Sequence, residues 1–421
     1  MKKTSLAIAV SAVCFGISLS AQAANISIAC GGVGKELLLC KTHAGAWAKK
    51  NDHTVTIVDM PKLVTDQLAL HQLNSRNNRA VADVIQVDVI WPSLLADDFI
   101  DLSDYVDEET LNQHFEAIVA VNQVNGQLVG IPWFTDLGIL LYRKDLLNKY
   151  QLPVPTTWTE LESTAKKIQK KERLAGNSKM WGFVWQGKAS EGLTCNALEW
   201  ISSYRGGTLM TQQGQSTVYN PPAIKAINRA ADWIGTLSPP EVLTYSEAEA
   251  REQFEQGYAV FMRHWPRAWH LSQLVESLKG YVGVSVLPKG GSSGQHTSTL
   301  GGWQLSVSKY SKHPDIAADL VRYLTSQSVQ KDRAMEGSYL PTIKALYQDQ
   351  EVLKKFPFFS ELGSILENNT MVVRPSNVTG KQYDKVSRAF WNAVHSVLSG
   401  KANARDSLKI LSGKLEQLKS E

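Results

Sequence analysis

Residues 131–144 are IPWFTDLGILLYRK, and they combine an aromatic pair, an acid and an apolar run. Trp133 and Phe134 precede Asp136, and the run 138–142 is predicted to form a buried strand. Rings beside a hydrogen-bond acceptor are typical of sugar sites, because the C–H face of a pyranose lies on a ring while its hydroxyls donate to carboxylates. The alternative is an ordinary core in which both rings are buried and Asp136 caps a turn.

The segments around this stretch alternate between strand and helix patterns. Strands are expected at 25–30, 53–58, 84–87, 128–131, 138–142, 181–185, 258–262, 281–287 and 300–307. Helices are expected at 34–50, 63–74, 157–173, 192–204, 222–237, 247–256 and 315–325. The Gly/Ser-rich segment 289–299 is expected to be a loop. The alternation predicts an open parallel α/β sheet, and the second half of the chain repeats the pattern.

The beginning of the chain predicts a secretory signal. Lys2 and Lys3 precede an apolar run at 6–19, and Ala21-Gln22-Ala23 offers a small-x-small cleavage site. The apolar run is too short for a convincing membrane span. We therefore expect cleavage after Ala23 and a mature protein in the periplasm. The roughly 400 residues that remain exceed what one core usually supports, so two domains are expected.

Charge and composition exclude several classes of partner. The formal net charge is +4, and loss of Lys2 and Lys3 with no acid lowers it to +2. This near balance, without a basic block, argues against nucleic acid and against an anionic membrane surface. The nine histidines show no paired ligand spacing and no CxxC occurs. We therefore expect no metal and no cofactor.

Three cysteines follow the predicted cleavage site: Cys30, Cys40 and Cys195. Cys30 would end the first strand, and Cys40 would lie in the second turn of the next helix. An oxidising compartment permits a disulfide between this close pair, which would stabilise the fold by roughly 2–3 kcal/mol. The alternative is two buried free thiols.

The sequence GGVGKE, residues 31–36, follows the first predicted strand. In open α/β sheets ligands bind beyond the carboxyl ends of the strands. Gly32 and its neighbouring glycines would let backbone N–H groups approach a ligand, and Glu36 could accept hydroxyl protons. Phosphate binding is an alternative for a Gly-rich loop at a helix start, but neither GxGxxG nor the P-loop pattern is met. A third possibility is a simple turn with Glu36 serving the helix dipole.

Four tryptophans lie at or near the ends of predicted strands: Trp91 in DVIWP (88–92), Trp133, Trp265 in MRHWP (262–266), and Trp303 after Gly301-Gly302, which interrupt the strand expected at 300–307. Each one alone is more easily explained as a core residue than as a ligand platform. Their recurrence at predicted strand ends favours a common aromatic site.

Taken together, these segments resemble the extracellular solute-binding proteins of carbohydrate ABC transporters, closest to the trehalose/maltose-binding group. The matching segments are VIQVDVIWPSLLAD (84–97), GIPWFTDLGILLYRKDLL (130–147), GFVWQGKASEGLTCNALEW (182–200), FMRHWPRAW (261–269), TLGGWQLSVS (299–308) and Arg374-Pro375. They cover nearly all of the mature chain in the family's order.

The resemblance implies a maltose-binding-protein-like fold of two α/β lobes with hinge crossings and a sugar in the cleft between them. It implies hydroxyl acceptors at Glu36, Asp88 and Asp136, stacking platforms at Trp265 and Trp303, a backbone contact at Gly302 and a hydroxyl donor at Arg374. Phe134 stands where relatives often have Tyr, which removes one phenol hydrogen bond. Glu191 is expected to be a structural or rim residue.

We expect lobe one at 24–131 and 299–340, and lobe two at 132–298 and 341–421, with the first crossing at Pro132. The expected function is that of a monomeric, non-enzymatic receptor that binds a neutral di- or oligosaccharide and delivers it to membrane permease subunits.

Two other classes remain open. A secreted glycoside hydrolase also needs aromatics and paired carboxylates, although nothing here marks one acid as a proton donor. A receptor for a charged solute such as a sugar phosphate would need several basic residues in these motifs, and only Arg263, Arg267 and Arg374 are near them.

Overall fold

The structure is a computed structural model that describes residues 23–31, 34–61, 64–368 and 370–419. The predicted signal sequence lies outside these residues except for Ala23, and Gly32 lies outside them as well. Within the described residues, no helix combines the length and apolarity needed to cross a bilayer.

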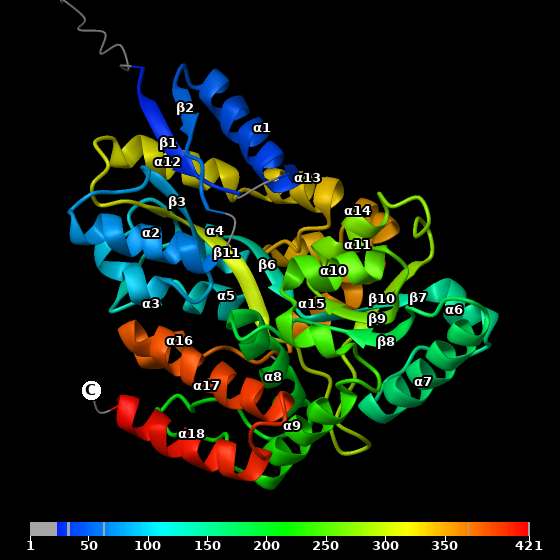
Figure 1. The fold of residues 1–421 in the computed structure, drawn as a ribbon. Helices are drawn as coiled ribbons and strands as arrows, with labels where there is room; N and C mark the ends of the chain where they lie inside the picture. The colour runs from blue at the N-terminus through cyan, green and yellow to red at the C-terminus, as the bar shows by residue number, and fades with distance from the viewer. Residues whose placement is uncertain (1–22, 32–33, 62–63, 369, 420–421) are drawn as a thin grey trace, which may run out of the picture.

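Two β-sheets form the framework (Figure 1). The first has the order β2-β1-β3-β11-β6, with β1 Asn25–Ala29, β2 Thr54–Ile57, β3 Val84–Asp88, β6 Ile131–Leu137 and β11 Leu300–Val307. The second has the order β10-β7-β9-β8, with β7 Ile139–Arg143, β8 Trp181–Val184, β9 Ala259–His264 and β10 Val282–Val286. A short hairpin joins β4 Gln123–Val124 to β5 Gln127–Leu128.

Both sheets are mixed, which corrects the expectation of an open parallel sheet. Strands β1, β2 and β3 are parallel, but β11 runs antiparallel to β3 and to β6. In the second sheet β8 and β9 are parallel, whereas β7 is antiparallel to both β9 and β10. Strand β11 enters the first sheet only after the chain has passed through the second, and it returns in the opposite direction.

Helices cover these sheets (Figure 1). Those along the first sheet are α1 Gly34–Lys50, α2 Val64–Arg76, α3 Pro92–Leu95, α4 Glu108–Asn112, α5 Glu116–Ala120, α12 Pro314–Leu324 and α13 Gln327–Gly337. The others are α6 Lys144–Lys149, α7 Trp158–Leu174, α8 Glu191–Ser203, α9 Pro221–Trp233, α10 Glu247–Glu255, α11 Arg267–Ser272, α14 Gln350–Lys355, α15 Phe359–Glu367, α16 Ser376–Thr379, α17 Tyr383–Leu398 and α18 Ala404–Lys419. Helix α12 packs on α1 and β11, and α17 packs on α8, α9 and α18.

Local sequence explains several helix and strand boundaries. The predicted capping box is present at the start of α7, where Thr157 and Glu160 bond each other's backbone N–H groups. Helix α9 ends at Trp233, earlier than expected, because Ile234 is extended and Gly235 has φ 72°. The predicted strand at 128–131 is divided between two strands: Leu128 ends β5, which pairs with β4 across a turn at Asn125 and Gly126, and Ile131 begins β6.

The chain passes from the first sheet to the second at Gly138, not at Pro132. All of 131–137 belongs to β6, including the Trp133–Asp136 cluster that was expected to follow a strand. A Cβ on Gly138 would overlap Oε1 of Glu199, which is buried in an ion pair with Arg263. Glycine is therefore required where the chain crosses.

The return crossing, before β11, lies against the first. Ser298 Oγ donates to the carbonyl of Gly138 over 2.6 Å, and the Thr299 N–H donates to Glu199 Oε1 over 3.1 Å. All of these groups are buried. The two strand crossings are thus hydrogen-bonded to each other, and the Glu199 carboxylate packs against the first and accepts a hydrogen bond from the second.

A disulfide joins Cys30, directly after β1, to Cys40 in α1, with the Cα atoms 6.4 Å apart. Cys195 is a buried free thiol. Whether the bridge forms in cells stays a prediction.

Candidate functional site

The ends of three neighbouring strands bring several predicted site residues together. Trp303 on β11 lies opposite Asp88 on β3 and opposite Phe134 on β6. Earlier on β11, Gly301 lies opposite Asp136. Because paired residues on adjacent strands stand side by side, the two acids and Trp303 occupy one edge of the first sheet.

Trp265 reaches the same edge from the second sheet, directly after β9. A Cβ on Gly301 would lie 3.2 Å from Cζ3 of Trp265 and 3.2 Å from Cβ of Asp136. The guanidinium carbon of Arg263 lies 4.0 Å from the centroid of the Trp265 ring. The missing side chain of Gly301 therefore lets an indole from one sheet lie beside a carboxylate from the other.

The predicted aromatic residues fall into two groups. Trp265 and Trp303 are partly exposed, as a stacking platform requires. Trp91 is 1% exposed and packs edge-on against Trp303, with ring centroids 5.7 Å apart. Phe134 is 3% exposed and Trp133 is fully buried. In this structure Trp91, Phe134 and Trp133 are therefore core residues rather than exposed platforms. Trp91 packs against the ring of Trp303 and helps to hold it in place.

Gly302 has φ 127°, and a Cβ there would lie 2.6 Å from the carbonyl oxygen of Phe134. Its own carbonyl accepts a hydrogen bond from the N–H of Val89 over 3.0 Å. The close approach of β6 explains why glycine is needed here, and the carbonyl is already engaged within the protein.

Glu36 lies in the first turn of α1 and has two partners in the chain. Its Oε1 accepts from Gln86 Nε2 over 2.9 Å, and its Oε2 forms an ion pair with Arg267 Nη1 at 3.0 Å. The amide oxygen of Gln86 in turn accepts from the N–H of Gly31 over 2.6 Å. Arg267 belongs to α11, so this ion pair joins the first sheet's helices to the second sheet's. A carboxylate has about four acceptor positions, so Glu36 can also accept from a ligand.

Asp136 differs from Glu36 because no residue of the described chain donates a hydrogen bond to its carboxylate. Its pKa is raised to about 8, first by burial and then by the nearby charge of Glu36, while the charge of Arg267 opposes the shift. Asp88 accepts from the Ile90 N–H over 3.1 Å, and burial raises its pKa to about 6 against the charge of Arg374. Burial thus disfavours the ionised form of both acids, and a hydrogen bond from a ligand hydroxyl would stabilise that form.

Arg374 is 5% exposed and anchors the far side of the site. Its Nη1 bonds Glu191 Oε1 at 3.0 Å, its Nη2 donates to the carbonyl of Leu300 over 3.2 Å, and Asp88 Oδ1 lies 3.8 Å from Nη2. Glu191 also accepts from the hydroxyls of Tyr383 and Ser387. These contacts tie α8 to α17 and favour the structural role that was expected for Glu191.

Several residues near these acids carried no signal in the sequence. Gln86 lies inside a predicted strand, where an apolar side chain is the usual occupant. Arg333 lies in α13 and Tyr339 lies just beyond that helix, far along the chain from every motif. A mid-helix arginine is normally solvent-exposed, so only the folded structure places it near the site.

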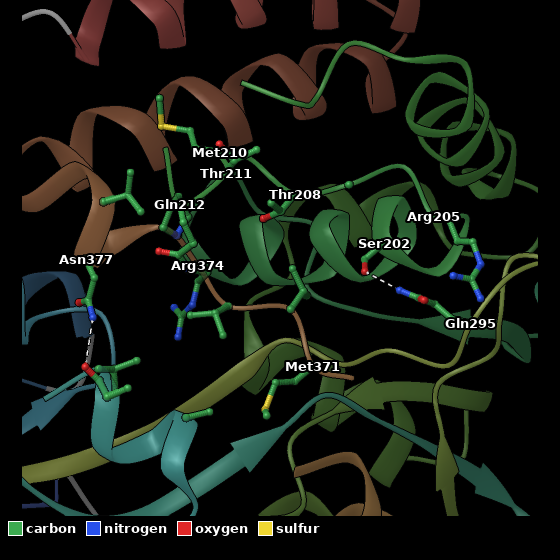
Figure 2. A pocket seen from close by; sticks show the side chains of 18 residues that line it. Ser202, Arg205, Thr208, Met210, Thr211, Gln212, Gln295, Met371, Arg374 and Asn377 are labelled. Atoms are coloured by element: carbon green, nitrogen blue, oxygen red, sulfur yellow. Dashed lines mark hydrogen bonds between the residues drawn. The ribbon is translucent and has the colours of Figure 1, made fainter. Parts of the chain in front are cut away.

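A cavity of about 750 Å³ adjoins the site at Arg374 (Figure 2). Met371 and neighbouring apolar residues form one wall, and Ser202, Thr208 and Gln295 lie on another side. Apart from Arg374, none of the predicted ligand residues lines this cavity. The cavity is therefore distinct from the edge where the acids and tryptophans meet. No group of three or more His, Cys, Asp or Glu side chains is arranged to hold a metal in the part of the chain that the structure describes.

The chain is similar to known proteins over nearly its whole length. A family model for bacterial extracellular solute-binding proteins matches residues 40–331. A probable ABC transporter-binding protein of Deinococcus radiodurans is 46% identical over 409 residues, which are 97% of this chain and 96% of the relative.

Solved structures show the same architecture. Maltose-bound MalE3 of T. maritima superposes with a TM-score of 0.87 at 36% identity and covers 94% of this chain and 100% of its own. The GacH receptor of Streptomyces glaucescens, solved unliganded and with acarbose, has a TM-score of 0.81 at 21% identity over 95% of this chain and 99% of its own. The expected two-lobe α/β fold is thereby confirmed.

Proposed function

The chain belongs to the bacterial extracellular solute-binding protein family, and we propose that its ligand is a neutral disaccharide or short oligosaccharide of the maltose or trehalose type. As a solute-binding protein it serves an ABC transporter, and we propose that it delivers the sugar to the permease subunits as a monomer in the periplasm. The signal sequence and its cleavage after Ala23 are part of this proposal.

One observation carries the choice of ligand. Asp136 is a half-buried acid with no donor from the described chain, and it lies beside the partly exposed ring of Trp265. A sugar supplies what this arrangement lacks, because its hydroxyls donate to the carboxylate while its C–H face covers the indole. An apolar ligand would leave the acid without a partner.

The division into lobes follows the two sheets. We propose lobe one at 24–137 and 299–340 and lobe two at 138–298 and 341–421, with the ligand between them. Trp303 and the three acids then belong to lobe one, and Trp265 belongs to lobe two. A sugar that contacts both lobes binds the closed form better than the open form, and this difference in affinity is what drives closure.

The relatives support this choice of ligand. The T. maritima protein is described as bound to maltose and is 36% identical to this chain. The family and its relatives are binding proteins rather than enzymes. Three of the basic groups near the acids are already paired within the chain, which disfavours an anionic ligand: Arg263 with Glu199, Arg267 with Glu36, and Arg374 with Glu191.

Titration calorimetry of the mature protein with maltose, trehalose, sucrose and glucose 6-phosphate tests the proposal. We expect saturable binding of at least one neutral disaccharide and no competition by the phosphate. Release of glucose during incubation with maltose or trehalose would indicate a hydrolase, and preference for the phosphate would indicate a charged-solute receptor.

A further inference from the structure

Arg333 is a buried cation without a partner for its N–H groups. The residue is 1% exposed, and Nε, Nη1 and Nη2 have no hydrogen-bond partner in the described part of the chain. A guanidinium offers five N–H donors. Burying such a charge unpaired is strongly unfavourable, so a partner from outside the described residues would lower the cost of this arrangement.

Aromatic rings surround the guanidinium and offset part of this cost. Its central carbon lies 3.9 Å from the ring centroid of Trp133, 4.5 Å from that of Tyr339 and 4.8 Å from that of Phe134. Cation–π contacts stabilise the charge but accept none of its hydrogen bonds. The hydroxyl of Tyr339, which is 2% exposed, also has no partner in the described chain.

This aromatic cage adjoins the proposed sugar site. Phe134 and Asp136 belong to the same strand, and the Thr135 N–H between them donates to the carbonyl of Leu340 over 2.8 Å. Tyr339 packs on Phe134 with ring centroids 5.0 Å apart. The guanidinium carbon of Arg267, which pairs with Glu36, lies 5.9 Å from the centroid of the Tyr339 ring. The cage is therefore near two of the predicted acceptors, Asp136 along strand β6 and Glu36 through Arg267.

The other charges of this region are already matched. Arg267 pairs with Glu36, and Arg374 pairs with Glu191. Two groups remain without hydrogen-bond partners in the described chain, the guanidinium of Arg333 and the carboxyl of Asp136. Burial lowers the pKa of Arg333 to about 10, and the ionised form of Asp136 is among the charges that oppose this shift.

We propose that Arg333 and Tyr339 are the donor half of the ligand site and Asp136 is the acceptor half, so that one neutral sugar bridges them. This inference rests on the proposed function. A hydroxyl group both donates and accepts, so adjacent sugar oxygens accept from the guanidinium and the phenol while another hydroxyl donates to Asp136. An anionic ligand would satisfy Arg333 but would face Asp136, Glu36 and Asp88.

The test compares Arg333→Met and Tyr339→Phe with the wild-type mature protein, using maltose in calorimetry and thermal unfolding without sugar. Methionine fills much of the same space and removes the charge. We expect R333M to lower maltose affinity about 10- to 150-fold and to raise the melting temperature of the sugar-free protein. Y339F, which keeps the ring, should lower affinity about 3- to 10-fold with little change in melting temperature.

Matched controls are Arg388→Met, which removes another arginine that lies over a tryptophan, and Tyr105→Phe, whose hydroxyl bonds Asp315 at the surface. Neither should change maltose affinity. If both cage variants fold and bind maltose as the wild type does, the inference is wrong while the proposed function stands. A fall in the melting temperature of R333M with unchanged affinity assigns Arg333 a purely structural role and also overturns it. If R333M does not fold, Y339F decides alone. Failure of the wild type to bind any neutral sugar would overturn the proposed function first.

Discussion

Replacing Asp136 by asparagine should weaken sugar binding and at the same time stabilise the sugar-free protein. Asparagine keeps the shape of the side chain but removes the charged acceptor. A hydrogen bond to a carboxylate contributes about 1.5–3 kcal/mol, so above about pH 8, where Asp136 is ionised, the loss of one such bond should lower affinity about 10- to 150-fold.

The gain in stability follows from the pKa of Asp136, which burial raises from 3.8 to about 8. Between these values the unfolded chain has released the proton while the folded protein still holds it. The free energy of unfolding therefore falls as pH rises from about 4 to 8, is unaffected by this group below 4, and is level above 8. At pH 7 the cost is on the order of 4 kcal/mol, because each pKa unit corresponds to about 1.4 kcal/mol. D136N should remove that cost.

The same pKa predicts a pH dependence of binding. If a sugar hydroxyl donates to the ionised carboxylate, binding releases a proton, and wild-type affinity should rise between about pH 6 and pH 8 and then level off. D136N should show no such rise. Calorimetry from pH 5.5 to 8.5 and thermal unfolding over the same range measure both effects. Asp384→Asn, at an exposed ion pair on α17, is the matched control. Wild-type affinity in a folded D136N would refute the assignment of Asp136 as acceptor.

Other predictions follow from the same structure. Trp265→Ala and Trp303→Ala should each lower maltose affinity at least tenfold, because each variant loses a ring on which the sugar can stack. The control Trp158→Phe, at a buried position in α7, should leave affinity unchanged, and binding curves for the three variants measure this. Mass spectrometry of protein purified from the periplasm should find Cys30 and Cys40 linked, and their joint replacement by serine should lower the free energy of unfolding by roughly 2–3 kcal/mol; two free thiols would contradict the bridge. Small-angle scattering should show the radius of gyration decreasing when sugar is added, and a constant radius during demonstrated binding would count against closure of two lobes.

Much of the fold could be predicted because its strands and helices obey simple local rules. Helix α1 and strand β11 have the boundaries that their periodicity predicts, and the capping box of α7 is where Thr157 and Glu160 indicate. The sequence pattern gave a wrong boundary for β6, the strand that carries Phe134 and Asp136. Pro132 and the aromatic–acid cluster resemble a loop, but β6 continues through them because both rings pack into cores and β11 pairs along the whole segment.

The site was predicted only in part, for a related reason. Asp88, Asp136 and Trp303 stand at or near the ends of predicted strands, so a rule about sheet edges finds them. Arg333 and Tyr339, the proposed donors, come near these acids through the packing of α13 against β6, which no local pattern encodes. The ion pair between Glu36 and Arg267 joins two elements that are far apart in the chain, so it too depends on the assembled fold.

The bonded crossings at Gly138 and Ser298 limit how the two sheets can move. Two segments that cross side by side and are hydrogen-bonded to each other cannot slide independently, and in the proposed division the chain crosses once more between residues 340 and 341. The expected motion is therefore a rotation of one sheet against the other about these crossings. A pair of distance labels, one on each sheet, would follow that rotation and would show whether the empty and the loaded protein differ in the distance between the sheets.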